Sequence, residues 1–137
     1  MTLLSYGIDV DYLRNQLGLS DARILEEVKQ SIPTHHVAFL ERLPAAVSTP
    51  NFFFSHAGAR PGVALAHQDQ NDLLSIRLPL DKDASPPFEK TVVHGHTFTR
   101  APIHSASRIV VETGPYLGGP LTAARILKGA VDFIAAD

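Results

Sequence analysis

The sequence predicts an α+β fold in which helices come first and strands follow. Up to about residue 44, apolar residues recur at helical spacing, and capping residues stand where helices would begin. From Ala45 onward the pattern changes to short β-branched and aromatic runs bounded by Gly and Pro. At 137 residues the chain fits one domain. We expect it to consist of a helical segment, 1–44, and a β-rich segment, 45–137.

The composition excludes several functional classes. The chain has no Cys, so it has no disulfide framework, no thiolate nucleophile and no cysteine-ligated zinc. Its net charge of −2 comes from interspersed charges without a Lys/Arg cluster, so we expect no nucleic acid partner. No apolar run approaches the ~20 residues that span a bilayer, and the first residues do not form a signal peptide. We therefore expect a soluble, cytoplasmic protein with no membrane partner.

Three helices are predicted in the first segment. The first covers Asp9 to Leu17, with an acidic residue near its N-terminus. The second begins after Ser20, a typical N-cap, and runs to about Ser31. The third begins at Pro33, which suits a first helical turn, and stops at Pro44. Charged residues of the second helix share one face, which indicates a solvated surface and not a site.

The second segment contains four predicted strands. They cover Ala45 to Ser48, Phe52 to Ser55, Lys90 to Val93 and Arg108 to Glu112. A helical turn is predicted within 68–77, and the Pro-rich stretch 78–87 is predicted to be a surface loop. The last stretch, Leu121 to Ala136, is ambiguous. Residue propensities favour a helix there, whereas Lys128-Gly129 between two apolar runs indicates a hairpin.

Two of these predicted strands end in a histidine beside a glycine. The aromatic strand is followed by His56-Ala57-Gly58, and the later strand ends in His94-Gly95-His96. Because functional groups are often carried by loops held on a rigid sheet, we expect the two strand ends to form one site. Neutral imidazoles suit Zn, Mn or Fe. Each ring could instead hydrogen-bond a nearby carbonyl, and two imidazoles are too few for a complete metal site.

Other residues are candidates for binding an anion. His94 is predicted to line the site and to position an anion or its neighbour. Arg77 and Arg60 could each offer a planar donor fork to a phosphate, although both could equally be surface residues. Tyr116 lies in a Gly-rich loop and could be an anchoring aromatic residue. The sequence has no nucleophile elbow, phosphate-binding loop or dinucleotide motif, so a serine hydrolase and the use of ATP or NAD are not supported.

Five short motifs follow one another along the chain. They are Phe-Phe-Ser-His-Ala-Gly-Ala-Arg-Pro-Gly at 53–62, Asp-Leu-Leu-Ser-Ile-Arg at 72–77, Val-Val-His-Gly-His-Thr at 92–97, Arg-Ile-Val-Val-Glu-Thr-Gly at 108–114 and Gly-Pro-Leu-Thr-Ala at 119–123. Together they resemble the second half of bacterial serine/threonine protein phosphatases of the calcineurin-like metallophosphoesterase superfamily, from about Ser5 to about Leu127. The resemblance implies an α/β/β/α sandwich. This chain would be a single partial domain, 1–137, with helices, a mainly antiparallel or mixed sheet and a closing β-hairpin.

The resemblance also implies a chemistry. In that family two metal ions, often Mn, Fe or Zn, hold a water or hydroxide that attacks phosphorus directly. By the match of motifs, His56 and His96 would bind one divalent metal. Arg77 would grip the phosphate, with Tyr116 at the mouth of the site and His94 lining it. The substrate would be a phosphoprotein or a small phosphate monoester.

The sequence departs from the family in ways that limit this expectation. The first-half motifs Asp-x-His, Gly-Asp-x-x-Asp-Arg-Gly and Gly-Asn-His-Glu do not occur, and Ser75, Glu112 and Pro115 replace the usual Trp, Asp and Ala. We therefore expect weak or no metal binding and little or no activity from this chain alone. An uncovered sheet favours self-association or a partner that supplies the missing half. The alternative is a non-catalytic module that binds a protein or an anion on a remnant of the scaffold.

Overall fold

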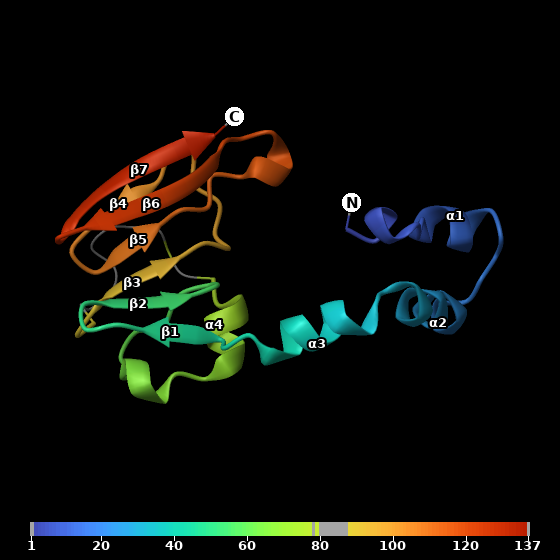
Figure 1. The fold of residues 1–137 in the computed structure, drawn as a ribbon, viewed down its shortest axis with the longest axis horizontal. Helices are drawn as coiled ribbons and strands as arrows, with labels where there is room; N and C mark the ends of the chain where they lie inside the picture. Colours follow the sequence, from blue (N-terminus) through green and yellow to red (C-terminus); the bar gives the residue numbers. More distant parts are fainter. Residues whose placement is uncertain (1, 78, 80–87, 137) are drawn as a thin grey trace. The chain divides into compact units, whose positions relative to one another are not determined.

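The structure is a computed structural model that describes residues 2–77, 79 and 88–136. Most of the predicted surface loop over 78–87 lies outside these residues. The chain divides into two compact units, Met1–Leu43 and Pro44–Asp137, each of which is described by itself (Figure 1). The division falls next to the predicted boundary between the helical and β-rich segments. That the two segments form one partial domain stays a prediction.

The first unit consists of short helices whose starts follow the local capping signals. They are the 3₁₀-helix η1 (Leu4–Tyr6) and the α-helices α1 (Val10–Asn15), α2 (Asp21–Ser31) and α3 (Thr34–Arg42). The Asp9 carboxylate accepts a hydrogen bond from the Tyr12 N–H, and the Ser20 hydroxyl accepts one from the Arg23 N–H. All three predicted α-helices are therefore confirmed, with ends within about two residues of the expected ones.

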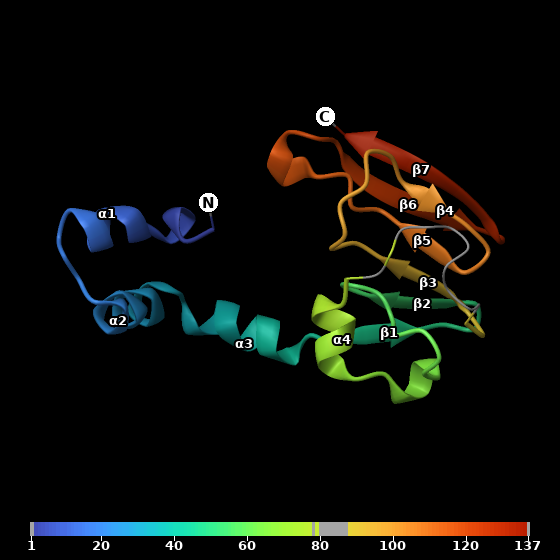
Figure 2. The same cartoon turned by 180° about the vertical axis from the view of Figure 1, so that it is seen from behind.

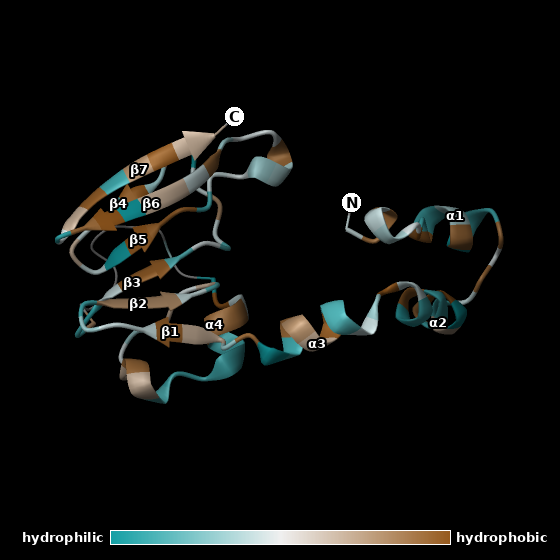
Figure 3. Ribbon diagram, in the orientation of Figure 1, coloured by the Kyte–Doolittle hydropathy of each residue, from teal (hydrophilic) through white to brown (hydrophobic). Residues whose placement is uncertain are grey.

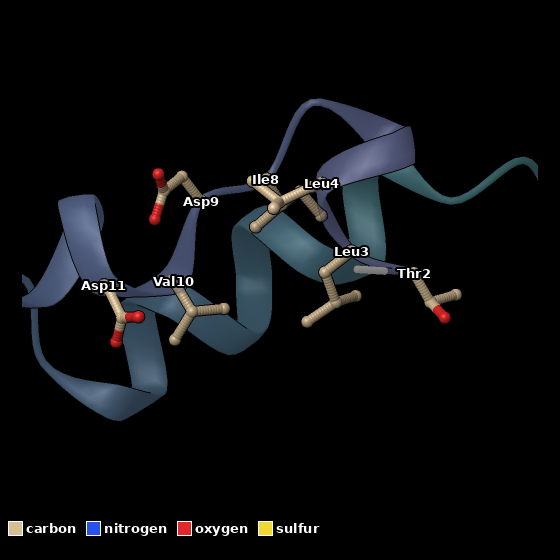
Figure 4. A pocket seen from close by; sticks show the side chains of 7 residues that line it. All are labelled: Thr2, Leu3, Leu4, Ile8, Asp9, Val10 and Asp11. Carbon is tan, nitrogen blue, oxygen red and sulfur yellow. The ribbon is translucent and has the colours of Figure 1, made fainter. Parts of the chain in front are cut away.

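The first unit buries few of its own apolar side chains. Among its described residues, only Ile8 and Ile24 are buried, whereas Leu40 on α3 is 65% exposed. A hollow of about 370 Å³ lies around η1 and the start of α1 (Figure 4). It is lined by Thr2, Leu3, Leu4, Ile8, Asp9, Val10 and Asp11. None of the predicted site residues lines this hollow.

The second unit is built on two sheets. A five-stranded sheet has the order β1-β2-β3-β5-β4, and a two-stranded sheet pairs β6 with β7 (Figures 1 and 2). The strands are β1 (Ala46–Ser48), β2 (Phe52–Ser55), β3 (Thr91–His94), β4 (Ile103–His104), β5 (Arg108–Val110), β6 (Leu121–Leu127) and β7 (Ala130–Ala136). The other elements are η2 (Leu65–His67), α4 (Gln70–Ser75) and η3 (Pro115–Leu117).

The centre of the larger sheet is parallel. β2 and β5 both run parallel to β3, while the edge strands β1 and β4 are antiparallel to their neighbours. Parallel strands are typically buried on both faces, and hydrophobic residues gather in β3 and β5 accordingly (Figure 3). Phe53, Val92 and Leu73 of α4 belong to one buried cluster, and Ile109 and Val110 are fully buried. The carboxyl ends of β2, β3 and β5 therefore meet at one end of a rigid core.

The C-terminal stretch is a hairpin, and the helical alternative is wrong. β6 and β7 pair in antiparallel register from Leu121 opposite Ala136 to Leu127 opposite Ala130. Lys128 and Gly129 between them have φ of 49° and 83°, the left-handed pair that a tight two-residue hairpin turn needs. The predicted fold class, α+β with a mixed sheet and a closing hairpin, is confirmed.

The helices are short compared with a membrane span. The longest in the described part of the chain, α2, has 11 residues. None of the helices described has the length and apolar character that crossing a bilayer requires.

Candidate functional site

The candidate site lies at the carboxyl ends of the three parallel strands. His56 follows β2, Gly95 follows β3, and Val111 follows β5. The Gly95 N–H donates to the His56 carbonyl at 2.9 Å, and the Val111 N–H donates to the His94 carbonyl at 3.0 Å. These backbone bonds join each loop to the next. Ligands of open α/β sheets commonly bind at this end of the strands, so the topology alone marks the place.

His56 and His96 are in direct contact there. Nε2 of His56 lies 3.0 Å from Nδ1 of His96, and the ring centroids are 4.9 Å apart with the planes tilted by 66°. One nitrogen donates a hydrogen bond and the other accepts it. The structure thus brings together the two histidines that the sequence places at separate strand ends. That they bind a metal stays a prediction.

The loop that carries His56 is anchored on both sides. The Ser55 hydroxyl donates to the Gly58 carbonyl at 2.9 Å, and the Ala57 N–H donates to the carbonyl of Leu73 in α4 at 2.8 Å. Ala57 is fully buried, whereas the His56 ring is exposed. Small residues around His56 therefore let the backbone pack against α4 while the imidazole faces outward.

His94 is the buried member of the histidine group. Only 3% of it is exposed, its Nδ1 lies 3.0 Å from the Gly95 carbonyl oxygen, and its Nε2 has no hydrogen-bond partner among the described residues. Burial lowers the pKa of His94, the hydrogen bond to Gly95 opposes this, and the nearby positive charge of Arg108 adds to the lowering. The neutral ring is therefore favoured. That His94 contacts a phosphate stays a prediction.

The other anion-binding candidates lie on exposed positions. Arg77 is exposed just after α4, and Tyr116 in η3 is 71% exposed. The guanidinium of Arg60 makes a two-pronged ion pair with Asp72, whose hydrogen bonds and charge raise the pKa of Arg60. Arg60 is thus engaged within the protein. Contacts of Arg77 and Tyr116 with a phosphate stay predictions.

Glu112 borders the site, and in sequence it stands where the resembled phosphatases usually have Asp. Its Oε1 accepts the Gly114 N–H at 3.1 Å. Its Oε2 lies 3.6 Å from the position that a Cβ atom on Gly95 would occupy, so the carboxylate faces the loop that carries His96. One sequence signal could have identified Glu112. It follows the buried strand β5 closely, just as His56 follows β2.

The two imidazoles suit neighbouring ligands of one metal ion. Nitrogens bound to one ion at roughly 2.0–2.1 Å lie about 2.8–3.4 Å apart, from a right angle at the ion to a tetrahedral one. The 3.0 Å separation of His56 Nε2 and His96 Nδ1 falls within that range. Within the described ranges, however, no group of three or more His, Cys, Asp or Glu residues could hold a metal. The donor set therefore fits part of a metal site.

Comparisons with known proteins support the fold. No family model matches the sequence, and no curated protein matches it. The chain is similar to a crystal structure described as that of a "putative diadenosine tetraphosphatase", with a TM-score of 0.63 and 24% sequence identity. The match covers 90% of this chain and 62% of that chain, so this chain spans less than two thirds of that protein. The likeness shows that the two chains share an α+β fold.

Proposed function

We propose that this chain carries part of the site of a metal-dependent phosphoesterase, with His56 and His96 as neighbouring ligands of one Mn, Fe or Zn ion. The observation that carries the proposal is the 3.0 Å approach of His56 Nε2 to His96 Nδ1 at the ends of parallel strands. The fold shared with the crystal structure described as that of a "putative diadenosine tetraphosphatase" and the order of the five sequence motifs support it. The finer assignment to serine/threonine protein phosphatases rests on the motifs alone.

The proposal assigns separate tasks to the chain's own residues. To hold a metal, both facing nitrogens must present lone pairs, so the hydrogen now shared by His56 and His96 moves to another ring nitrogen. A divalent ion held there would polarise a phosphoryl oxygen as a Lewis acid. Arg77 would donate hydrogen bonds to the phosphate oxygens from its exposed position after α4, with Tyr116 near the entrance.

The substrate class is a phosphate ester or anhydride, in which water attacks phosphorus and an alcohol or a phosphate leaves. The motifs point to a phosphoprotein or a small phosphate monoester, whereas the similar crystal structure is described as a diadenosine tetraphosphatase. Hydrolysis at phosphorus is common to these substrates. Because the remaining family ligands do not occur in this sequence, activity would need a partner of different sequence that supplies them.

Metal titration tests the proposed ligands. Mn²⁺ and Zn²⁺ are titrated into the purified chain and into the His56→Ala, His96→Ala and His104→Ala variants. His104 is an exposed histidine on β4 and serves as the matched control. We expect one weak site that loses about tenfold or more in affinity in the first two variants and is unchanged in the third. Equal binding by all four proteins would overturn the assignment.

Hydrolysis assays test the need for the missing groups. With Mn²⁺ added, an aryl phosphate and a dinucleoside tetraphosphate are incubated with the purified chain. We expect turnover close to background for both, because two ligands do not complete a two-metal site. Robust turnover that His96→Ala abolishes would show that this chain is active without further ligands.

A second function is a non-catalytic module that binds a protein or an anion. The observation that favours it is the outer face of the β6–β7 hairpin, where Leu121, Leu127 and Ile134 are 64%, 66% and 51% exposed. Exposed apolar groups of this kind favour association with another chain or a second copy. If Mn²⁺ and Zn²⁺ neither bind to the chain nor change its melting temperature, and His96→Ala makes no difference to either measurement, this function replaces the first.

A further inference from the structure

His96 has a backbone conformation that residues with a side chain usually avoid. Its φ is 63°, and apart from Lys128 no other non-Gly residue in the described part of the chain has a positive φ. The Thr97 N–H donates to the Gly95 carbonyl at 2.7 Å, which closes a three-residue turn around His96. A γ-turn with positive φ at its centre is rare and strained. Such a turn persists only where the surrounding structure holds it.

The His94 ring supplies a second bond to the same turn. Its Nδ1 lies 3.0 Å from the Gly95 carbonyl oxygen, and since a carbonyl can only accept, Nδ1 must carry the hydrogen. The Gly95 oxygen thus receives hydrogen bonds from both the His94 ring and the Thr97 backbone. Both bonds fix the orientation of the peptide that leads into His96.

His94 is well placed for this task because it cannot easily move. It ends β3, where it pairs with Val110 of β5, and only 3% of it is exposed. The Gly95 N–H is fixed as well, since it donates to the His56 carbonyl at 2.9 Å. The turn around His96 is therefore held from the sheet through His94 and from the facing loop through His56.

We propose that His94 is a positioning residue for His96. Through the bond from Nδ1–H to the Gly95 carbonyl, it holds the strained turn that places His96 Nδ1 within 3.0 Å of His56 Nε2. The sequence leaves two tasks open for His94, positioning an anion or positioning its neighbour, and its burial and bonding support the second. The proposal deepens the proposed function, because it explains how one of the two ligands is held.

Three variants separate the hydrogen bond from the filling of space. His94→Asn keeps a donor near the position of Nδ1, and His94→Leu has nearly the same shape as Asn without the donor. His94→Gln places its amide near the position of Nε2, which has no partner among the described residues. The Asn–Leu pair therefore tests the bond, and the Asn–Gln pair tests its location. Thermal unfolding identifies the variants that fold.

Imidazole NMR of the metal-free chain measures the positioning directly. The signals are cross-relaxation between the ring protons of His56 and His96 and the ¹⁵N shifts of the facing nitrogens. We expect the ring contact in the wild type and in His94→Asn, and its loss in His94→Leu and His94→Gln. Wild-type contact in a folded His94→Leu, or equal behaviour of Asn and Gln, would overturn the proposal. If the Leu variant does not fold, the Asn–Gln pair decides.

A double-mutant cycle gives a second readout. Glycine adopts positive φ without strain, so a turn with His96→Gly needs less support. We expect the fall in melting temperature caused by His94→Leu to shrink by about half or more in the His96→Gly background. Equal falls in both backgrounds would mean that His94 serves the core alone. Because neither readout uses a metal, this proposal and the metal-binding proposal can fail independently.

Discussion

Gly119 packs closely against the backbone of Thr113 and Gly114. A Cβ atom there would stand 2.2 Å from the Thr113 carbonyl oxygen, a distance at which the backbone must shift. We therefore predict that Gly119→Ala destabilises the chain by about 2 kcal/mol or more. Gly118→Ala is the matched control, because its Cβ would meet open space and only its φ of 84° is unfavourable. Thermal unfolding followed by circular dichroism compares the two, and a larger loss in Gly118→Ala would contradict the account.

The pair formed by Arg60 and Asp72 predicts a dependence of stability on pH. The hydrogen bond and charge of Arg60 lower the pKa of Asp72 below its ordinary value near 3.8. A group with a lowered folded pKa contributes stability above its unfolded pKa and loses it as the pH falls through the folded pKa. We predict that Asp72→Asn lowers the melting temperature near neutral pH and that the difference from wild type closes as the pH falls through the lowered pKa of Asp72. A difference that persists in acid would show that another contact is responsible.

Part of the candidate site was predictable from the sequence because each candidate histidine follows a recognisable strand. The sequence placed His56 and His96 at neighbouring strand ends, since β-branched or aromatic runs that stop at a glycine are visible in one dimension. It could not give the two facing nitrogens, the strained turn at His96 or the position of Glu112. These depend on how loops from three strands pack together, which spacing along the chain does not encode.

At the scale of elements, the hairpin turn offers a stabilising change. Lys128 has φ of 49° although lysine does not favour the left-handed region, and Gly129 follows it with φ of 83°. Asn-Gly is the preferred pair for such a turn. We predict that Lys128→Asn stabilises the chain by about 0.5 kcal/mol, whereas Lys128→Ala does not. Denaturant unfolding measures both, and a loss of stability in the Asn variant would show that the turn has another geometry in solution.

The elements themselves were predictable where a local signal specifies them. Asp9 and Ser20 cap helices as expected, and the parallel strands follow the apolar runs. At the C-terminus, residue propensity and turn chemistry disagree. The hairpin forms because Gly129 accepts the positive φ of the turn and the alternating residues of β6 and β7 half-bury one face. The two-residue strand β4 gave no signal, since its pairing with β5 is purely tertiary.

At the scale of the whole molecule, the account depends on the parallel order β2-β3-β5. Because these three strands run in the same direction, the loops after them meet at one end, and groups from residues 56, 96 and 112 come close together. An antiparallel arrangement would place alternate loops at opposite ends of the sheet. The sheet therefore brings three separate sequence motifs together at one end of the parallel strands.

The most direct test is to count the imidazoles on a bound probe ion. Cu²⁺ binds nitrogen sites more tightly than the other divalent ions of its row, so it reports on a weak site. Pulsed electron paramagnetic resonance at less than one equivalent of Cu²⁺ counts the coordinated imidazoles through their remote nitrogens. The account predicts two coordinated imidazoles in the wild type and in His104→Ala, and one in His56→Ala and in His96→Ala. Two imidazoles in every variant would contradict it, because the ion would then be bound elsewhere.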